Sequence, residues 1–382
     1  MRGLAAAVLI VPLAVGACGD DAAPPPPPPI PEALTDFWRT LEMDATVFTH
    51  TDGEWLEDYG DAPMYGTAYY ARVGAERSDT AMLDLARAAR DYDLSVVGQA
   101  NADRDWFLAN MEEAMMSAMG IVEYASATGD EAGLDAVETF LDTANDLVNL
   151  FGDYLPSGMD IGSFALETYG PTSITGAVAL VNLQYAVNLD TPRRDERIRR
   201  AERIVASIDR HAFDGERYLF EPGVDRLYLY PNSIMMIVLC RLHEVTGDRG
   251  YLDRTLSVAG AIEPLRSPTR GGFHSPYSAE YMGATTDDYS TLSSQNYLTF
   301  AFLLLYERTR DRQWFDEAVG VIDFERLRLY DTAQGRVLHH WMDGRIAQPG
   351  DPEYFCSGCN HQTLYMLWYL HRRVGQLPVD PP

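Results

Sequence analysis

The sequence predicts an all-α fold, an (α/α)6 toroid in which six helical hairpins close into a ring. Three observations favour this fold class. A helical hairpin recurs along the chain, the two helices of each hairpin differ in their apolar pattern, and the two ends of the chain each supply one unpaired helix.

The recurring hairpin has three clear copies and two weaker ones. In IVEYASATGDEAGLDAVETFL, IMMIVLCRLHEVTGDRGYLDRTLSVA and FAFLLLYERTRDRQWFDEAVGVI, an apolar run leads through a polar turn into an amphipathic run. The weaker copies are YYARVGAERSDTAMLDLARAA and LVNLQYAVNLDTPRRDERIRRAERIV. The turns fall 54, 60, 58 and 63 residues apart, at Glu76, Asp130, Asp190, Asp248 and Asp311. A near-constant period of this size indicates a helical repeat array.

The two helices of each hairpin are expected to occupy different layers. Residues 234–242 (IMMIVLCRL) and 298–306 (LTFAFLLLY) are apolar nearly all round, as in helices that are buried on every side. The helix that follows a turn instead carries a single apolar stripe, such as Ile198, Ile204 and Ile208. This pattern predicts an inner helix, a tight turn and an outer helix in each repeat.

The two ends of the chain supply the sixth helical hairpin. Residues 361–373 (HQTLYMLWYLHRR) supply a sixth inner helix, and residues 31–43 (PEALTDFWRTLEM) supply a helix with no partner before it. Pairing the two gives six hairpins and brings the chain ends together. The arrangement resembles the (α/α)6 toroid of the six-hairpin glycosidase-like superfamily, over the whole mature chain but without one family's catalytic motif. The resemblance implies a substrate cleft at the face where the inner helices begin.

The first residues predict export and a lipid anchor. MRGLAAAVLIVPLAVGAC has the charge, apolar run and small residues of a secretory leader covering residues 1–17. Val15 to Cys18 resembles the bacterial lipobox, which implies lipidation of Cys18; ordinary cleavage with Cys18 as an incidental thiol is the alternative. Six consecutive prolines make residues 18–30 a stiff tether. We expect a periplasmic or surface-exposed protein anchored to a membrane.

The remainder is expected to form one domain. No linker-like composition interrupts residues 31–375, and residues 376–382 form a tail. The net charge of −27 argues against nucleic acid or anionic lipid as direct partners. We expect a monomer.

The connections between hairpins indicate which face carries the chemistry. Those that precede inner helices are long, spanning residues 149–171, 212–231, 266–290 and 327–360, whereas the turns after inner helices are short. Long loops in a compact domain are commonly functional. These loops are rich in acidic and aromatic residues, which suit sugars because rings stack on pyranose faces and carboxylates bind hydroxyls or transfer protons.

Glycoside hydrolysis requires two carboxylates that flank the scissile bond. Asp287 and Asp288 come just before an inner helix, and Glu221 and Asp225 are candidate partners on another loop. Adjacent side chains diverge, so Asp287 and Asp288 are not expected to form the pair by themselves. Asp288 could alternatively cap the helix that follows. Candidate substrate-binding residues on the same face are Tyr169, Tyr228, Tyr230, His274, Tyr281, His340 and Trp341.

These residues favour a surface-anchored glycoside hydrolase acting on a glycan or oligosaccharide. A non-catalytic glycan-binding or scaffold lipoprotein is the alternative from another class. A sugar epimerase is a third interpretation, because N-acylglucosamine epimerase-like toroids use histidines for proton transfer, although their histidine motifs do not align with this chain.

The stretch CSGCNH, residues 356–361, admits several interpretations. A local disulfide between Cys356 and Cys359 is favoured because export permits it. A zinc site formed by both thiolates and His361 is an alternative, although no second half-site completes it. Thiol–disulfide exchange is another, because a CxxC at a helix start lowers the pKa of its first thiol. We expect no cofactor apart from this possible zinc.

Overall fold

The computed structural model describes residues 28–44, 62–155, 163–276, 289–342, 344–349, 351 and 355–374. The predicted leader, the predicted lipidation site at Cys18 and the predicted tail from residue 376 lie outside these ranges. The inner helices are α2 (Ala62–Arg77), α5 (Met111–Thr128), α7 (Ser163–Asn188), α9 (Leu229–Thr246), α12 (Leu292–Thr309) and α14 (Ser357–Tyr369). The outer helices are α1 (Glu32–Asp44), α3 (Thr80–Ala102), α6 (Leu134–Leu150), α8 (Arg194–Ala212), α10 (Arg249–Ala261) and α13 (Arg312–Phe324).

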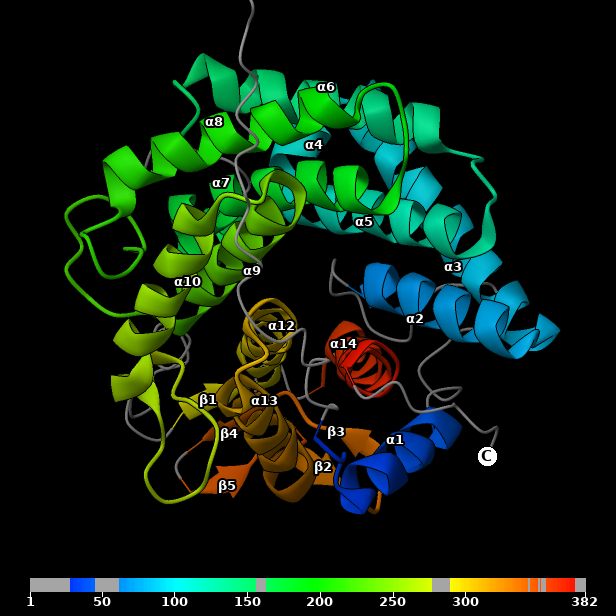
Figure 1. The fold of residues 1–382 in the computed structure, drawn as a ribbon. Coiled ribbons are helices and arrows are strands. Elements are labelled where there is room, and N and C mark those ends of the chain that lie inside the picture. The colour runs from blue at the N-terminus through cyan, green and yellow to red at the C-terminus, as the bar shows by residue number, and fades with distance from the viewer. Residues whose placement is uncertain are drawn as a thin grey trace, which may run out of the picture.

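The inner helices form a closed ring. Each packs against the next in the order α2, α5, α7, α9, α12 and α14, and α14 packs against α2. The outer helices α6, α8, α10, α13 and α1 lie outside this ring (Figure 1). The predicted (α/α)6 toroid is confirmed.

The last hairpin is built from the two ends of the chain. Helix α1 packs on α14, and the Thr35 hydroxyl lies 3.0 Å from Nε2 of His371. The Trp38 ring packs against the His371 ring at 4.7 Å, and its indole N–H donates to the Tyr69 hydroxyl of α2 at 2.8 Å. Helix α1 therefore covers the seam between α14 and α2.

Burial follows the expected difference between layers. In α9 every residue from Pro231 to Leu242 is buried, as the all-round apolar pattern predicts. Helix α8 instead turns Ile198, Ile204 and Ile208 inward, while Arg199 and Glu202 face outward. The core lies between the two layers and on the inner side of the ring.

The short turns share one construction. Gly129 and Gly247 end α5 and α9 in the left-handed conformation, and Arg310 ends α12 with the same geometry at φ 57°. Asp248 and Asp311 then accept backbone N–H groups at the start of α10 and α13. The predicted turn at Glu76 is displaced, because Glu76 belongs to the last turn of α2.

Several boundaries differ from those expected. Helix α7 begins at Ser163, so that Pro171 lies inside it, and α14 begins at Ser357, four residues before the predicted start. A short helix α4 (Arg104–Ala109) joins α3 to α5. A 3-10 turn covers Glu263–Leu265, and π-helical turns cover Glu325–Leu329 and Leu370–Val374.

Two small antiparallel sheets lie within the loops before α12 and α14. One has the order β1 (Tyr289–Thr291), β4 (His340–Met342) and β5 (Arg345–Ile346), with Ser290 opposite Trp341. The other pairs β2 (Tyr330–Asp331) with β3 (Arg336–Val337). None of the helices in the described ranges is long and apolar enough to cross a membrane.

Candidate functional site

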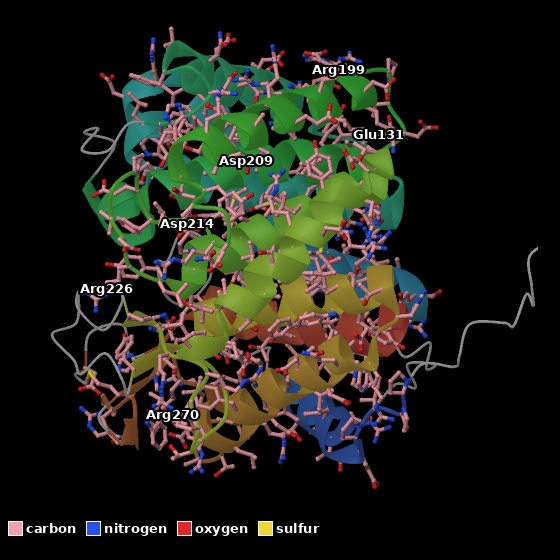
Figure 2. The ribbon with its side chains drawn as sticks, turned by 60° about the vertical axis from the view of Figure 1, so that its left-hand side comes forward. Glu131, Arg199, Asp209, Asp214, Arg226 and Arg270 are labelled. Carbon is pink, nitrogen blue, oxygen red and sulfur yellow. A yellow bond between two sulfur atoms is a disulfide. The ribbon has the colours of Figure 1, made fainter. Side chains whose placement is uncertain are left out.

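The toroid has two ends, one formed by the long loops and the other by the short turns. The inner helices begin at the long-loop face, which carries Asp214, Arg226 and Arg270 at one side of the view in Figure 2. They end at the short-turn face on the opposite side, where Glu131 lies in the turn between α5 and α6.

A layer of tyrosines fills the axis of the ring between these faces. Tyr65 of α2 contacts Tyr297 of α12 and Tyr365 of α14, with ring centroids 6.4 and 6.0 Å apart. Tyr230 of α9 contacts Tyr297 at 5.1 Å, and the Tyr297 hydroxyl lies 3.7 Å from the sulfur of Met116. Because α5 and α12 are opposite members of the ring, the Tyr297–Met116 contact spans the axis.

One stripe of α5 follows the axis from end to end. Glu112, Met116 and Glu123 are spaced four and seven residues apart, which places them on one side of a helix. Met116 joins the tyrosine layer, and Glu123 lines a central cavity at the short-turn face. Glu112, in the first turn and half-buried, therefore faces the axis from the long-loop face.

Sequence reasoning did not select Glu112. The connection before α5 contains α4 and is short, so its length did not indicate a functional loop. The available signal was a pair of acidic residues, Glu112 and Glu113, in the first turn of an inner helix, where the helix dipole favours negative charge. Glu113 accepts a hydrogen bond from the Tyr92 hydroxyl of α3 at 3.2 Å, so it is held nearer the outer layer.

Asp93 is a buried carboxyl beside this helix. The Thr67 hydroxyl donates to it at 2.8 Å, and burial raises its pKa well above the usual value. Asp93 therefore joins α3 to α2 and α5 as a buried structural group. With no exposed surface, it cannot meet a substrate.

The acidic residues selected from the sequence fall in different places. Asp287 and Asp288 lie outside the described residues. The Asp225 side chain is 89% exposed and forms an ion pair with Arg217 at 2.5 Å, so it faces solvent. Glu221 lies near the buried Tyr154, whose pKa is raised to about 12 chiefly by burial, with a further contribution from the Glu221 charge.

The aromatic candidates divide into core and loop positions. Tyr230 belongs to the tyrosine layer, whereas Tyr228 is buried beneath Arg226, whose guanidinium lies 5.7 Å from the ring. The ring of Trp341 lies 6.0 and 5.8 Å from the guanidinium groups of Arg270 and Arg328. Tyr281 and the side chain of Tyr169 lie outside the described part of the structure.

The two selected histidines differ in accessibility. His340 is fully buried and stacks on Tyr289 at 5.4 Å, so its ring packs in the core instead of facing a cleft. His274 accepts a hydrogen bond from Arg270 at 2.9 Å. It borders a peripheral cavity of about 640 Å³ between the loop carrying Arg226 and the end of α10, away from the axis.

Cys356 and Cys359 form a disulfide at the start of α14. Cys356 occupies the N-cap position, and its sulfur accepts the backbone N–H of Cys359 at 3.0 Å. A disulfide provides no thiolate for a metal, and the described residues contain no group of three or more potential metal ligands. The zinc interpretation is therefore not supported in this part of the chain.

His361 is a buried neutral side chain. Its Nδ1 donates to the Ser357 carbonyl at 2.9 Å, which leaves Nε2 to accept from the Tyr70 hydroxyl at 3.3 Å. Burial lowers the pKa of His361 to about 4. Its partners on α2 and in the first turn of α14 explain its position without a ligand.

Solved structures share this fold over nearly their whole length. A cellobiose 2-epimerase from Bacillus thermoamylovorans aligns with TM-score 0.63 and 14% identity, covering 89% of this chain and 99% of that one. A glycoside hydrolase family 76 α-1,6-mannanase from a Salegentibacter species aligns with TM-score 0.62 and 13% identity, covering 88% and 99%. A D-mannose isomerase aligns with TM-score 0.61 and 11% identity, covering 90% and 98%. The predicted likeness to six-hairpin glycosidase-like toroids is thus confirmed at the level of fold.

Sequence comparisons add no closer relationship. No family profile matches the chain, and no characterised protein matches it.

Proposed function

We propose that this protein is a carbohydrate-active enzyme whose site lies at the long-loop end of the toroid axis. The observation that carries the proposal is the position of Glu112, a carboxylate on the axial stripe of α5 above the tyrosine layer. Proteins that share this fold are named as mannanases, sugar epimerases and a sugar isomerase, which supports a carbohydrate substrate.

Within this class we favour a glycoside hydrolase. Glu112 and Glu113 are consecutive carboxylates in the first turn of an inner helix. One of the mannanase structures is of an inactive variant in which two consecutive aspartates are replaced by alanine. Glu112 would act as acid, base or nucleophile, and Asp287 or Asp288 would supply the second carboxylate that glycoside hydrolysis needs.

The test is an activity screen on residues 28–382 with α-1,6-mannotetraose, cellobiose and mannose, in which products are separated by chromatography. Glu112→Gln is expected to lower turnover by about 10²-fold or more, because it removes a group that transfers protons in the transition state. Glu131→Gln, at the short-turn face, is the matched control and should keep full activity.

Each result of this screen bears on a specific alternative. Wild-type turnover in Glu112→Gln would exclude Glu112 from the chemistry. Conversion of cellobiose or mannose into an isomer without hydrolysis would replace the hydrolase with an epimerase or isomerase. Binding of sugars without any product would favour a non-catalytic glycan-binding protein.

We also propose that the protein is exported and anchored to a membrane through lipidated Cys18. The support is the sequence alone: a leader, a lipobox-like VGAC and a proline-rich tether. Metabolic labelling with a fatty acid in a bacterial host should mark the wild type but not Cys18→Ser. Equal release of both proteins from membranes by salt would contradict the anchor.

A further inference from the structure

A central cavity lies at the opposite end of the axis from Glu112. It has a volume of about 350 Å³ and is bounded by the C-terminal parts of α2, α5, α7, α9 and α14. Its polar and aromatic lining includes Arg72, Glu123, Asn188, Arg241, Tyr365 and Trp368. Tyr365 also belongs to the tyrosine layer, so the cavity begins where that layer ends.

Fixed ion pairs surround the cavity. Arg72 binds Glu123 at 2.8 Å and also donates to Ser126 and Asn188, each at 3.0 Å. Arg241 binds Glu244 at 2.6 Å. These pairs join α2 to α5 and hold Arg241 against the end of its own helix, so the hydrogen-bonding groups that line the cavity have defined positions.

Charges around the cavity are balanced. Glu244 also binds Arg308 at 3.2 Å, and Glu76 at the rim binds Arg372 at 2.7 Å. Each acidic residue of the lining is thus paired with at least one arginine. A charged ligand would find no excess of opposite charge, so the cavity favours a neutral, polar ligand.

Arg241 retains a donor that the protein does not use. The Arg241 side chain is only 4% exposed, and its Nε has no hydrogen-bond partner among the described residues. Leaving a buried donor unsatisfied costs about 1–3 kcal/mol. The Nε atom is itself buried, so a ligand hydroxyl would accept instead from the part of the Arg241 guanidinium that lines the cavity.

Aromatic side chains supply the apolar part of the lining. Tyr365, Trp368 and Tyr369 form one cluster on α14, with Tyr365 and Trp368 ring centroids 5.3 Å apart. The Trp368 indole N–H donates to Glu76 at 3.3 Å, which fixes the ring beside the cavity entrance. Aromatic side chains beside fixed donors and acceptors give the lining both apolar and polar parts, which suits the mixed surface of a sugar ring.

We propose that this cavity is a second saccharide site, taking a neutral monosaccharide or disaccharide at the short-turn face. The volume is near the lower end of about 300–1,000 Å³ that is usual for small-molecule sites, which suits one or two sugar rings. The tyrosine layer separates it from Glu112, so its occupation does not require catalysis at the long-loop face.

Calorimetric titration of residues 28–382 with mannose, glucose, cellobiose and α-1,6-mannobiose tests the proposal. Ala127 lines the cavity and is half-buried, so Ala127→Trp should fill the entrance and remove one binding event per chain. Ala132→Trp places the same side chain at an exposed position on the same face and should leave binding unchanged. Glu112→Gln should retain the binding event that Ala127→Trp removes.

A second variant tests the site if Ala127→Trp does not fold, as judged by circular dichroism. Glu76→Ala at the exposed rim removes the acceptor of Trp368 and Arg372 and should weaken binding at least several-fold. Absence of binding by all four sugars, or equal binding by every variant, would overturn the proposal. Tighter binding of glucuronate than of glucose would overturn the assignment to a neutral sugar.

Discussion

Gly120 determines how closely α5 approaches its neighbours. Its Cα faces α2 and α3, and a Cβ built there would overlap the Asp93 carboxyl and lie 3.1 Å from the Met64 Cα. The neighbouring backbone leaves little room to adjust. A glycine in the middle of this inner helix is therefore required by packing, although it lowers helix propensity.

Gly120→Ala is expected to lower the free energy of unfolding by about 1–3 kcal/mol, because overpacking outweighs the gain in helix propensity. Gly98→Ala is the control, since a Cβ on Gly98 of α3 meets nothing within 4 Å. That control should be neutral or stabilising by up to about 1 kcal/mol. Denaturant titrations measure both changes, and equal stability of the two variants would contradict the packing argument.

His361 makes the stability depend on pH in a defined direction. A histidine in the unfolded chain titrates near 6.5, whereas burial lowers the pKa of folded His361 to about 4. The unfolded chain therefore binds the extra proton between these values. Stability that is present above pH 6.5 is lost as the pH falls towards 4, on the order of 3 kcal/mol.

His361→Gln removes this titration but keeps an acceptor for the Tyr70 hydroxyl. The difference in free energy of unfolding between wild type and variant should shrink by about 3 kcal/mol from pH 7 to pH 4. Denaturation of both proteins across this range measures it. Parallel pH profiles would show that His361 does not titrate differently in the folded chain.

At the scale of the element, the short turns allow a glycine and a residue with a side chain to be compared in the same left-handed position. Gly247 occupies the left-handed position after α9, whereas Arg310 occupies it after α12 at φ 57°. A residue with a Cβ pays about 1–2 kcal/mol for this conformation. The Arg310 guanidinium lies 5.8 Å from the Tyr306 ring, which offsets part of this cost.

Arg310→Gly is expected to raise the thermal midpoint, with a gain of up to about 1 kcal/mol after the added flexibility of the unfolded chain is subtracted. The reverse change, Gly247→Arg, should lower stability by a similar amount. Differential scanning calorimetry measures both. Destabilisation by Arg310→Gly would show that the contact with Tyr306 outweighs the backbone cost.

The helices also show which features of an element can be predicted from the sequence and which cannot. The hairpins and their layers were predictable because apolar periodicity reports burial directly, as in residues 234–242. The start of α14 was not, since its first turn, Ser357 to Asn360, is polar but buried. Asn360 exchanges two hydrogen bonds of 2.8 Å with the backbone of Val337, a partner that only the folded chain supplies.

The candidate site was predictable only in its general location. The long-loop face follows from loop lengths, but the direction of Glu112 depends on which side of α5 meets the axis. That side is fixed by the contact of Met116 with Tyr297 of the opposite helix, 181 residues from Met116 in sequence. His340 was selected as a substrate-binding residue but is buried, because its position in a loop did not indicate that its ring would pack against Tyr289.

At the scale of the whole molecule, ring closure depends on α1. Leu34, Phe37, Trp38 and Leu41 of this helix are buried, and Trp38 contacts both Tyr69 and His371. Removing α1 would expose the seam between the first and last inner helices. Helix α14 also packs directly on α2, through Trp368 and Arg372 on Glu76, but α1 covers this contact, so we expect the loss of α1 to weaken the seam.

Residues 45–382 should therefore unfold at a temperature roughly 10 °C or more below residues 28–382, and Trp38→Ala alone should cost about 3–5 kcal/mol. Arg39→Ala is the control, because this side chain is 50% exposed on the outer side of α1. Thermal scans provide the comparison. Equal midpoints for the two lengths would show that the ring closes without α1.

The tyrosine layer separates Glu112 from the cavity at the short-turn face, so the two ends of the axis do not share one channel through this layer. Substitutions on one side of Tyr297 and Tyr365 can change one end while the packing that supports the other stays in place. The same six helices could thus acquire or lose a function at one end independently of the other. Tyr365, which belongs to the layer and also lines the short-turn cavity, is the position where such independence would end.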